Sequence, residues 1–290
     1  MNPAPSVIVF SVLSGLGFGL LAYLGAGIVQ PYGWLAFLWW GLGYGLAILG
    51  LLAATFHLAN PKNALKAFSQ WRTSWLSREA WAAVATLILL APAALSDWLN
   101  LGWSPQIGYG GAVLALLTVF TTSMIYTQIK AVPRWNHWIN PVMFLGFSIT
   151  GGAVLAGQPA ARYLLGGLAV LLLAVWKLGD QQFKKRAQTL GKATGLDRIG
   201  DASVFEQAHT AGNYLLREMI FVVARKHVQK LRIIAIAMAS LVPIVLLILF
   251  PATLLAFTIA AVCHVIGAFA ARWLFFAQAE HVVGLYYGAR

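Results

Sequence analysis

Charged residues are scarce in this chain of 290 residues, and acidic residues are the scarcest. Only 10% of the residues are charged, 8 of them are Asp or Glu, and 60% of the chain is hydrophobic. A soluble domain of this length could not bury so much apolar surface, so the composition excludes a soluble protein. The hydrophobic runs are continuous and do not alternate with polar residues, which predicts transmembrane helices and not a β-barrel.

Cysteine is nearly absent as well. Cys263, inside the last apolar run, is the single thiol of the sequence. It excludes an intrachain disulfide and a cysteine-held zinc or iron–sulfur centre, so a partner must hold any cluster that serves this protein. Paired histidines at matching depth, which would hold a b-type haem, are not evident, since His57 ends one run and His264 lies near the middle of another. We expect neither a metal nor haem in this chain.

Eight apolar runs approach the length of about 20 residues that a membrane-spanning helix needs. They are residues 7–29, 34–58, 79–99, 107–130, 138–157, 162–178, 231–249 and 253–275. The first run lacks the basic start and the cleavage site of a removable signal peptide, so we expect it to remain as a span. The expected fold is an all-α integral membrane protein: one domain over residues 1–290, with eight transmembrane helices and a long connection at about residues 179–230.

Positive charge is distributed unevenly over the predicted connections. Of the 20 lysines and arginines, all but Arg162 lie near the connections after the second, fourth and sixth runs or near the C-terminal end. Basic connections stay in the cytoplasm, so these connections and both termini are expected there. The cations therefore adjoin a membrane, and without a nucleic-acid-binding motif they predict lipid or protein contacts and no nucleic-acid partner.

Residues 55–80 bring ionisable side chains to the ends of two predicted spans. His57 closes the second span and Glu79 opens the third, and ionisable groups in such places indicate function. A structural explanation has equal weight, with an interfacial histidine and a glutamate in the first turn of a helix that Ser77 caps. Basic and aromatic residues between them predict a short interfacial helix from Pro61.

Further polar residues are predicted on the same face of the membrane. Tyr126 ends the fourth span, where it either bonds a ligand carbonyl or anchors the helix in the interface. In the long connection, residues 191–201 have the composition of a loop and residues 203–227 the apolar spacing of a helix. His264 is a candidate proton relay or haem ligand, and a hydrogen-bonded histidine between helices is at least as well supported.

Several stretches resemble one family of membrane anchors. They are His57-Leu58 with the following proline, and residues 74–79, 124–133, 213–219, 225–227 and 272–276. Together they resemble the membrane anchor subunit of the dimethyl sulfoxide reductase family, the DmsC-like anchors, over essentially the whole chain. The resemblance implies a multi-pass protein of the bacterial inner (cytoplasmic) membrane that binds quinone, either ubiquinone or menaquinone. It also implies an iron–sulfur subunit and a molybdopterin catalytic subunit as partners, so this chain is the quinone-reactive subunit and does not itself act on the substrate.

The resemblance also assigns residues. The histidine that closes span two and the glutamate that opens span three line the family's quinone site, and they match His57 and Glu79. Imidazole suits this role because it donates a hydrogen bond to a carbonyl and moves a proton near neutral pH. The remaining expected quinone-site residues are Trp71, Arg72, Trp75, Arg78 and Tyr126. The expected partner-docking residues are Arg217, Arg225, Lys226 and His227.

The predicted cytoplasmic orientation narrows the branch of the family. With its basic face in the cytoplasm, the chain resembles the sulfite-oxidising, quinone-reducing members of the family (sulfite dehydrogenase, SoeC-like). This resemblance predicts sulfite oxidation with quinone reduction. One alternative is the anchor of a DMSO reductase or another terminal reductase that oxidises quinol. A small-solute transporter is a second alternative, although inverted repeats and paired broken spans are not evident. A passive scaffold without any site is the third.

Overall fold

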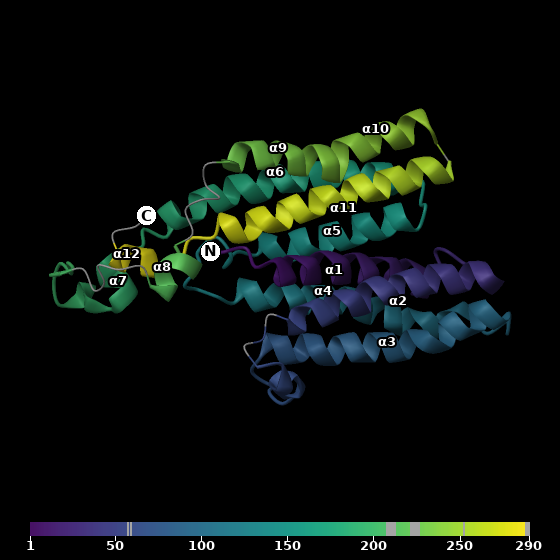
Figure 1. The fold of residues 1–290 in the computed structure, drawn as a ribbon, viewed down its shortest axis with the longest axis horizontal. Helices are drawn as coiled ribbons and strands as arrows, with labels where there is room; N and C mark the ends of the chain where they lie inside the picture. The colour runs from purple at the N-terminus through teal and green to yellow at the C-terminus, as the bar shows by residue number, and fades with distance from the viewer. Residues whose placement is uncertain (57, 59, 207–212, 221–226, 252, 288–290) are drawn as a thin grey trace.

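The computed structural model describes residues 1–56, 58, 60–206, 213–220, 227–251 and 253–287. These described residues form helices and connections and contain no β-strand. The long helices run alongside one another in an elongated bundle (Figure 1). The expected all-α architecture is therefore confirmed.

The helices have the following bounds. The long ones are α1 (Pro5–Gly25), α2 (Gly33–Thr55), α3 (Trp75–Leu99), α4 (Tyr109–Thr127), α5 (Ile139–Leu155), α6 (Ala161–Lys185) and α11 (Leu254–Ala277). Between α6 and α11, one span consists of α9 (Val228–Ile236), the π-helical turn η5 (Ala237–Leu241) and α10 (Val242–Leu249). The short helices are η1 (Pro61–Phe68), η2 (Pro105–Gly108), α7 (Leu190–Thr194), η3 (Leu196–Arg198), α8 (Tyr214–Glu218) and α12 (Val283–Tyr286).

Seven helical segments in the described part of the chain are long and apolar enough to cross a membrane. The remaining apolar helix, α5, has 17 residues, which at 1.5 Å per residue make about 26 Å. It nevertheless packs against α1, α4, α6 and α11 inside the bundle. Three predicted boundaries were wrong by one to two turns, because α1 ends at Gly25, α3 begins at Trp75 and α6 continues to Lys185.

Helix α1 lies inside the bundle and is the most buried of the seven spans. Its glycines allow the backbones of neighbouring helices to approach closely. A Cβ atom on Gly17 would lie 2.3 Å from the backbone nitrogen of Ala47 in α2, and one on Gly19 would lie 2.0 Å from the carbonyl oxygen of Ser148 in α5. Small residues permit such close approach between helices in lipid.

The π-helical turn supplies a hydrogen bond to α11. Pro243 has no N–H, so it cannot donate to the carbonyl of Ala239 four residues before it. That carbonyl instead accepts from Nδ1 of His264, at 2.7 Å. Since a carbonyl cannot donate, the proton lies on Nδ1 of this buried imidazole. Of the two roles considered for His264, the structure shows the hydrogen bond between helices.

The two ends of the bundle differ. Both termini and the short helices α7, α8 and α12 gather at one end, on the left in Figure 1. We call it the basic end; it comprises residues 60–74, 128–138, 186–220 and 278–287 as far as they are described. The opposite end holds the connections α1–α2, α3–α4, α5–α6 and α10–α11 (Figure 1).

The long connection differs from its predicted structure. Of residues 203–227, the described part contains one five-residue helix, Tyr214–Glu218, so the prediction of one continuous helix was wrong. Asn213 starts this helix by accepting a hydrogen bond from the N–H of Leu216 at 2.9 Å, and residues 203–206 have no helical turn. Residues 191–201, predicted as a loop, include part of α7 and all of η3.

Candidate functional site

The connection between α2 and α3 folds back on the bundle at the basic end. Asn60 accepts a hydrogen bond from the N–H of Lys62 at 3.2 Å and so starts the short helix η1, which the sequence predicted from Pro61. The indole of Trp81, one turn and a half into α3, donates to the carbonyl of Phe68 at 3.0 Å. This bond fixes the end of η1 beside the start of α3.

Arg78 organises the exposed part of this connection. Its Nε donates to the carbonyl of Trp71 at 3.0 Å, and its Nη2 donates to the carbonyl of Arg72 at 2.6 Å. Its guanidinium lies 4.3 Å from the ring centroid of Trp75, a cation–π contact. The structure therefore brings together Trp71, Arg72, Trp75 and Arg78, which we call the loop cluster.

Glu79 follows the loop cluster but lies inside the bundle. Its side chain is 4% exposed, and Thr122 of α4 donates a hydrogen bond to its Oε1 at 2.6 Å. Trp75 packs edge-on against Phe120 of the same helix. Trp75 and Glu79 are four residues apart and so share one face of α3, which joins the exposed loop cluster to the buried carboxylate.

The expected cap of α3 was wrong. Ser74 occupies the N-cap position, one turn earlier than predicted, and the helix begins with the apolar Trp75. Ser77 lies inside the helix, and its Oγ accepts from the N–H of Gln70 at 3.3 Å. Glu79 is therefore beyond the first turn, and a first-turn dipole contact does not explain its position.

Two residues on other helices complete a group that we call the buried polar cluster: Glu79, Thr122, Tyr126 and Arg272. Tyr126 is one turn from Thr122 on α4 and interacts electrostatically with both Glu79 and Arg272. Glu79, Thr122 and Arg272 each lie four or five residues from a helix end, about 6 to 8 Å inside the basic end. These three residues of α3, α4 and α11 thus lie at one depth, and Tyr126 lies one turn nearer the basic end.

Arg272 is 3% exposed, and its guanidinium lies 3.5 Å from the ring centroid of Phe144. Its Nη1 has no hydrogen-bond partner among the described residues. It faces a cavity of about 10 Å³ that Ser11 of α1 also lines, close to the smallest volume that holds one water molecule. A buried cation in a membrane bundle marks a functional position.

The predicted quinone-site residues therefore fall into two groups. Tyr126 is 8% exposed and packs against the rings of Trp135, Phe144, Phe275 and Phe276 at 5.3 to 5.8 Å. It belongs to the interior and does not wall the loop cluster. His57 lies outside the described residues.

The predicted docking residues are only partly described. Arg217 of α8 and His227, just before α9, are exposed at the basic end. Arg225 and Lys226 lie outside the described residues.

Thr122 and Arg272 were not among the site residues predicted from the sequence. Arg272 had a signal, because it is a charged residue at the end of an apolar run and within a stretch that resembles the anchor family. Thr122 had none, since Thr121 beside it has the same side chain; both hydroxyls lie within hydrogen-bond distance of the carbonyl of Thr118, and only that of Thr122 also bonds Glu79.

The chemistry of the two groups suits a quinone better than a metal ion. In the part of the chain that the structure describes, no three His, Cys, Asp or Glu side chains could jointly hold a metal. A quinone headgroup needs flat apolar walls, hydrogen-bond donors and a group that exchanges protons. Trp71 and Trp75 offer the walls, and Glu79 with Thr122 offers the proton-exchanging group one helical turn away.

Comparison with known proteins identifies the family of the chain. The family model described as DMSO reductase anchor subunit (DmsC) matches residues 36–288. The chain is 29% identical to one of the subunits of a sulfite dehydrogenase from Allochromatium vinosum, over 99% of both chains. No solved structure matches the chain. With the family model covering most of its length, this multi-pass membrane protein belongs to the DMSO reductase anchor subunit (DmsC) family.

Proposed function

We propose that this chain is the quinone-binding anchor of a molybdopterin and iron–sulfur oxidoreductase complex in the bacterial inner membrane. It would exchange electrons between the quinone pool and an iron–sulfur partner. The observation that carries the proposal is a carboxylate, Glu79, buried one turn behind a surface cluster of two indoles and two guanidiniums. Burying such a carboxylate in a membrane bundle is unfavourable in free energy, which indicates that it has a function.

Within this proposal the residues have separate tasks. Trp71 and Trp75 wall the ring of the quinone, and Arg78 fixes both through its hydrogen bonds and its cation–π contact. His57 donates a hydrogen bond to one carbonyl, and Glu79 exchanges a proton while Thr122 holds its Oε1. Bound quinone supplies a two-electron carrier whose carbonyl oxygens take up protons.

The topology of the proposal follows the distribution of charge. One domain over residues 1–290 crosses the membrane eight times, with α5 as the shortest crossing, and the basic end faces the cytoplasm. The iron–sulfur subunit docks on that end through Arg217, Arg225, Lys226 and His227, and the molybdopterin subunit attaches to it. Sulfite oxidation with quinone reduction is the proposed reaction of the complex, supported by the similarity to the sulfite dehydrogenase protein from Allochromatium vinosum.

Two substitutions test the quinone site in the purified complex: His57→Ala and Glu79→Gln. Loss of proton transfer lowers a rate by about 10² or more. We expect quinone-linked turnover to fall by that factor in both variants, while the catalytic partners still reduce a soluble artificial electron acceptor. Glu206→Gln makes the same chemical change at an exposed glutamate and should leave both activities unchanged. Full quinone-linked turnover in both site variants would place the site elsewhere and favour a passive scaffold.

A further inference from the structure

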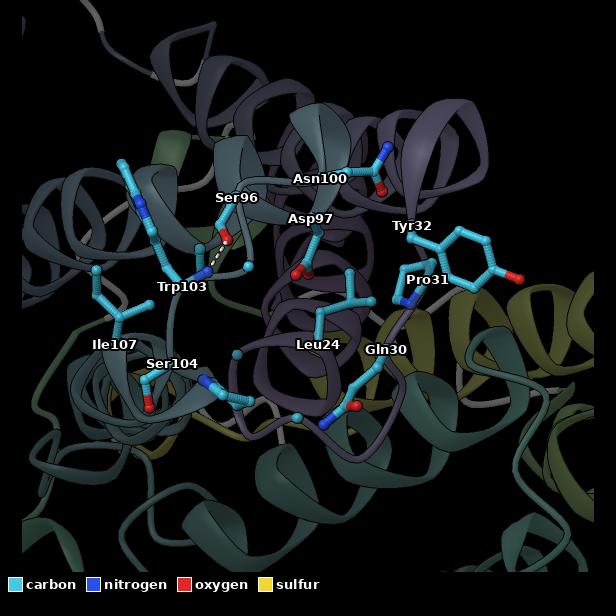
Figure 2. A pocket seen from close by; sticks show the side chains of 15 residues that line it. Leu24, Gln30, Pro31, Tyr32, Ser96, Asp97, Asn100, Trp103, Ser104 and Ile107 are labelled. Carbon is cyan, nitrogen blue, oxygen red and sulfur yellow. Dashed lines mark hydrogen bonds between the residues drawn. The ribbon is translucent and has the colours of Figure 1, made fainter.

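A pocket of about 340 Å³ lies at the opposite end of the bundle, away from the loop cluster and the buried polar cluster (Figure 2). Four parts of the chain form it: the end of α1, the last turns of α3, the α1–α2 connection and the α3–α4 connection. Its polar lining residues include Gln30, Ser96, Asp97, Asn100 and Ser104. None of these residues has a part in the proposed quinone chemistry.

The wall of this pocket is preformed by local hydrogen bonds. Asn100 ends α3 in the left-handed conformation, with φ of 54°, and the chain turns back sharply after it. The N–H of Leu101 then donates to the carbonyl of Ser96 at 3.0 Å, and the N–H of Trp103 donates to Oγ of Ser96 at 3.1 Å. Figure 2 shows the second of these bonds beside the hollow. A site held open in this way needs no rearrangement to take a ligand.

Asp97 projects from α3 into this hollow, with its carboxylate directed toward Leu24 in Figure 2. Its Oδ2 accepts a hydrogen bond from the indole of Trp40 at 2.9 Å. Among the residues that line the pocket, all of which are described, none is basic. The pocket therefore holds a half-buried negative charge that no cation of this lining compensates, an arrangement that favours a positively charged ligand.

Aromatic side chains place the pocket at the level of the lipid headgroups. Trp98 contacts Trp34 and Phe37, with ring centroids 6.0 Å and 4.9 Å apart. Trp34 and Trp103 are both largely exposed at this end of the bundle. Tryptophans on the outer surface of a membrane protein gather where headgroups meet the hydrocarbon, so the headgroup of a lipid can reach Asp97.

We propose that this pocket binds a primary ammonium group, the cationic chemistry of an ethanolamine lipid headgroup, with Asp97 as its counter-ion. An ammonium has three N–H donors. The carboxylate of Asp97 and the side-chain oxygens of Gln30 and Ser104 offer acceptors for them across the hollow. A trimethylated choline headgroup has the same charge but no N–H donor, so it cannot make these bonds. This inference does not depend on the proposed quinone site.

The test uses the complex purified from membranes, stripped of lipid and analysed by native mass spectrometry. The probes are a dioleoyl ethanolamine lipid, a choline lipid with the same acyl chains, and free ethanolamine. We expect the ethanolamine lipid to bind about tenfold more tightly than the choline lipid, as loss of a charged hydrogen bond predicts. Asp97→Asn keeps an acceptor for Trp40 but removes the charge, and it should abolish the preference. Asp201→Asn removes an exposed carboxylate at the basic end and should preserve it.

The results distinguish free ethanolamine from a lipid headgroup as the source of the ammonium group. Displacement of the bound ethanolamine lipid by millimolar free ethanolamine would show that the headgroup alone suffices. Failure of that displacement, with the preference still dependent on Asp97, would show that the acyl chains contribute and that a lipid is the ligand. Equal binding of the two lipids, or a preference that survives Asp97→Asn, would overturn the proposal. Ser104→Leu fills the pocket without touching the charge and should weaken ethanolamine binding in the same way, even if Asp97→Asn assembles poorly.

Discussion

At the scale of single residues, Glu79 shows what a sequence can and cannot predict. Its position at the start of a span made it a candidate functional residue, because an ionisable group is costly to place there, with a role in starting the helix as the equal alternative. Its hydrogen bond to Thr122 could not be foreseen, because the face that α4 turns toward α3 depends on packing along the whole helix. The same holds for Arg272, which comes within electrostatic range of Tyr126 from a helix almost 150 residues further along the chain.

The hydrogen bond between Thr122 and Glu79 makes a prediction at this scale. Thr122→Val keeps the shape of the side chain and removes the donor to Oε1. A hydrogen bond to a charged group is worth about 1.5–3 kcal/mol, so quinone-linked turnover should fall about tenfold or more. The measurement is steady-state turnover of the purified complex with a soluble quinone.

Thr121→Val is the matched control for this prediction. It makes the same change at the neighbouring residue, whose hydroxyl donates to the carbonyl of Thr118 and does not contact Glu79. The variant should retain turnover close to that of the unmodified complex. Equal losses in the two variants would mean that the effect is on helix packing and not on the carboxylate.

At the scale of elements, composition predicted the presence of the long helices more accurately than the residues at which they begin. The serine at 77 with a nearby glutamate resembled a helix start, yet α3 begins one turn earlier at Trp75. Its first residue, Trp75, packs against Phe120 of α4, so tertiary contact extends the helix beyond the local capping signal. In the long connection, by contrast, apolar spacing over residues 203–227 overstated the helix, because Asn213 starts a separate short one.

The start of α5 has a histidine whose role depends on pH. Nδ1 of His137 accepts a hydrogen bond from the N–H of Ile139 at 3.1 Å. Partial burial, and then the positive charges of Arg186 and Lys185, lower the pKa of His137 below its ordinary value. The imidazole of His137 therefore binds a proton more readily in the unfolded chain than in the folded one. The neutral imidazole thus contributes to the stability of the fold above a pH of about 6.5, and this contribution is lost as the pH falls.

His137→Asn should reduce that pH dependence, because the amide oxygen of Asn accepts the same hydrogen bond without titrating. The expected result is a smaller drop in apparent unfolding temperature between pH of about 7.5 and about 5.5 than in the unmodified protein. Thermal unfolding of the purified protein across that range measures it. His227→Asn, at an exposed histidine, is the control and should leave the profile unchanged. Identical profiles for His137→Asn and the unmodified protein would contradict the prediction.

At the scale of the whole molecule, the sequence predicted the class of protein because composition is a bulk property. A chain with 60% hydrophobic residues in continuous runs has few folds open to it. Composition does not predict which helices α1 packs against, because glycine-rich runs are compatible with several partners. The close approach of Gly17 to Ala47 and of Gly19 to Ser148 selects α2 and α5 among them.

The number of membrane crossings depends on α5, whose 17 residues extend about 26 Å against a hydrocarbon core of about 30 Å. If α5 crosses, the connections before and after it lie on opposite sides of the membrane. Lys130 precedes α5 and Ala160 follows it, and both are exposed. Because Cys263 is the single cysteine of the chain, a Cys263→Ala background allows one new thiol at a time.

We expect Lys130→Cys in that background to react with a membrane-impermeant maleimide only in inside-out vesicles, and Ala160→Cys only in right-side-out vesicles. Lys192→Cys, in α7 of the basic end, should behave as Lys130→Cys does, because the positive-inside rule assigns both to the cytoplasm. The measurement is the labelled fraction of each variant in the two vesicle orientations.

Labelling of Lys130→Cys and Ala160→Cys from the same side would leave α5 as a helix that enters the membrane without crossing it. The chain would then cross seven times, and the helices after α5 would have the reverse orientation, with the α6–α9 connection outside the cytoplasm. Since that connection carries the four residues proposed to dock the iron–sulfur subunit, such a result would also remove the docking surface from the side on which the loop cluster lies.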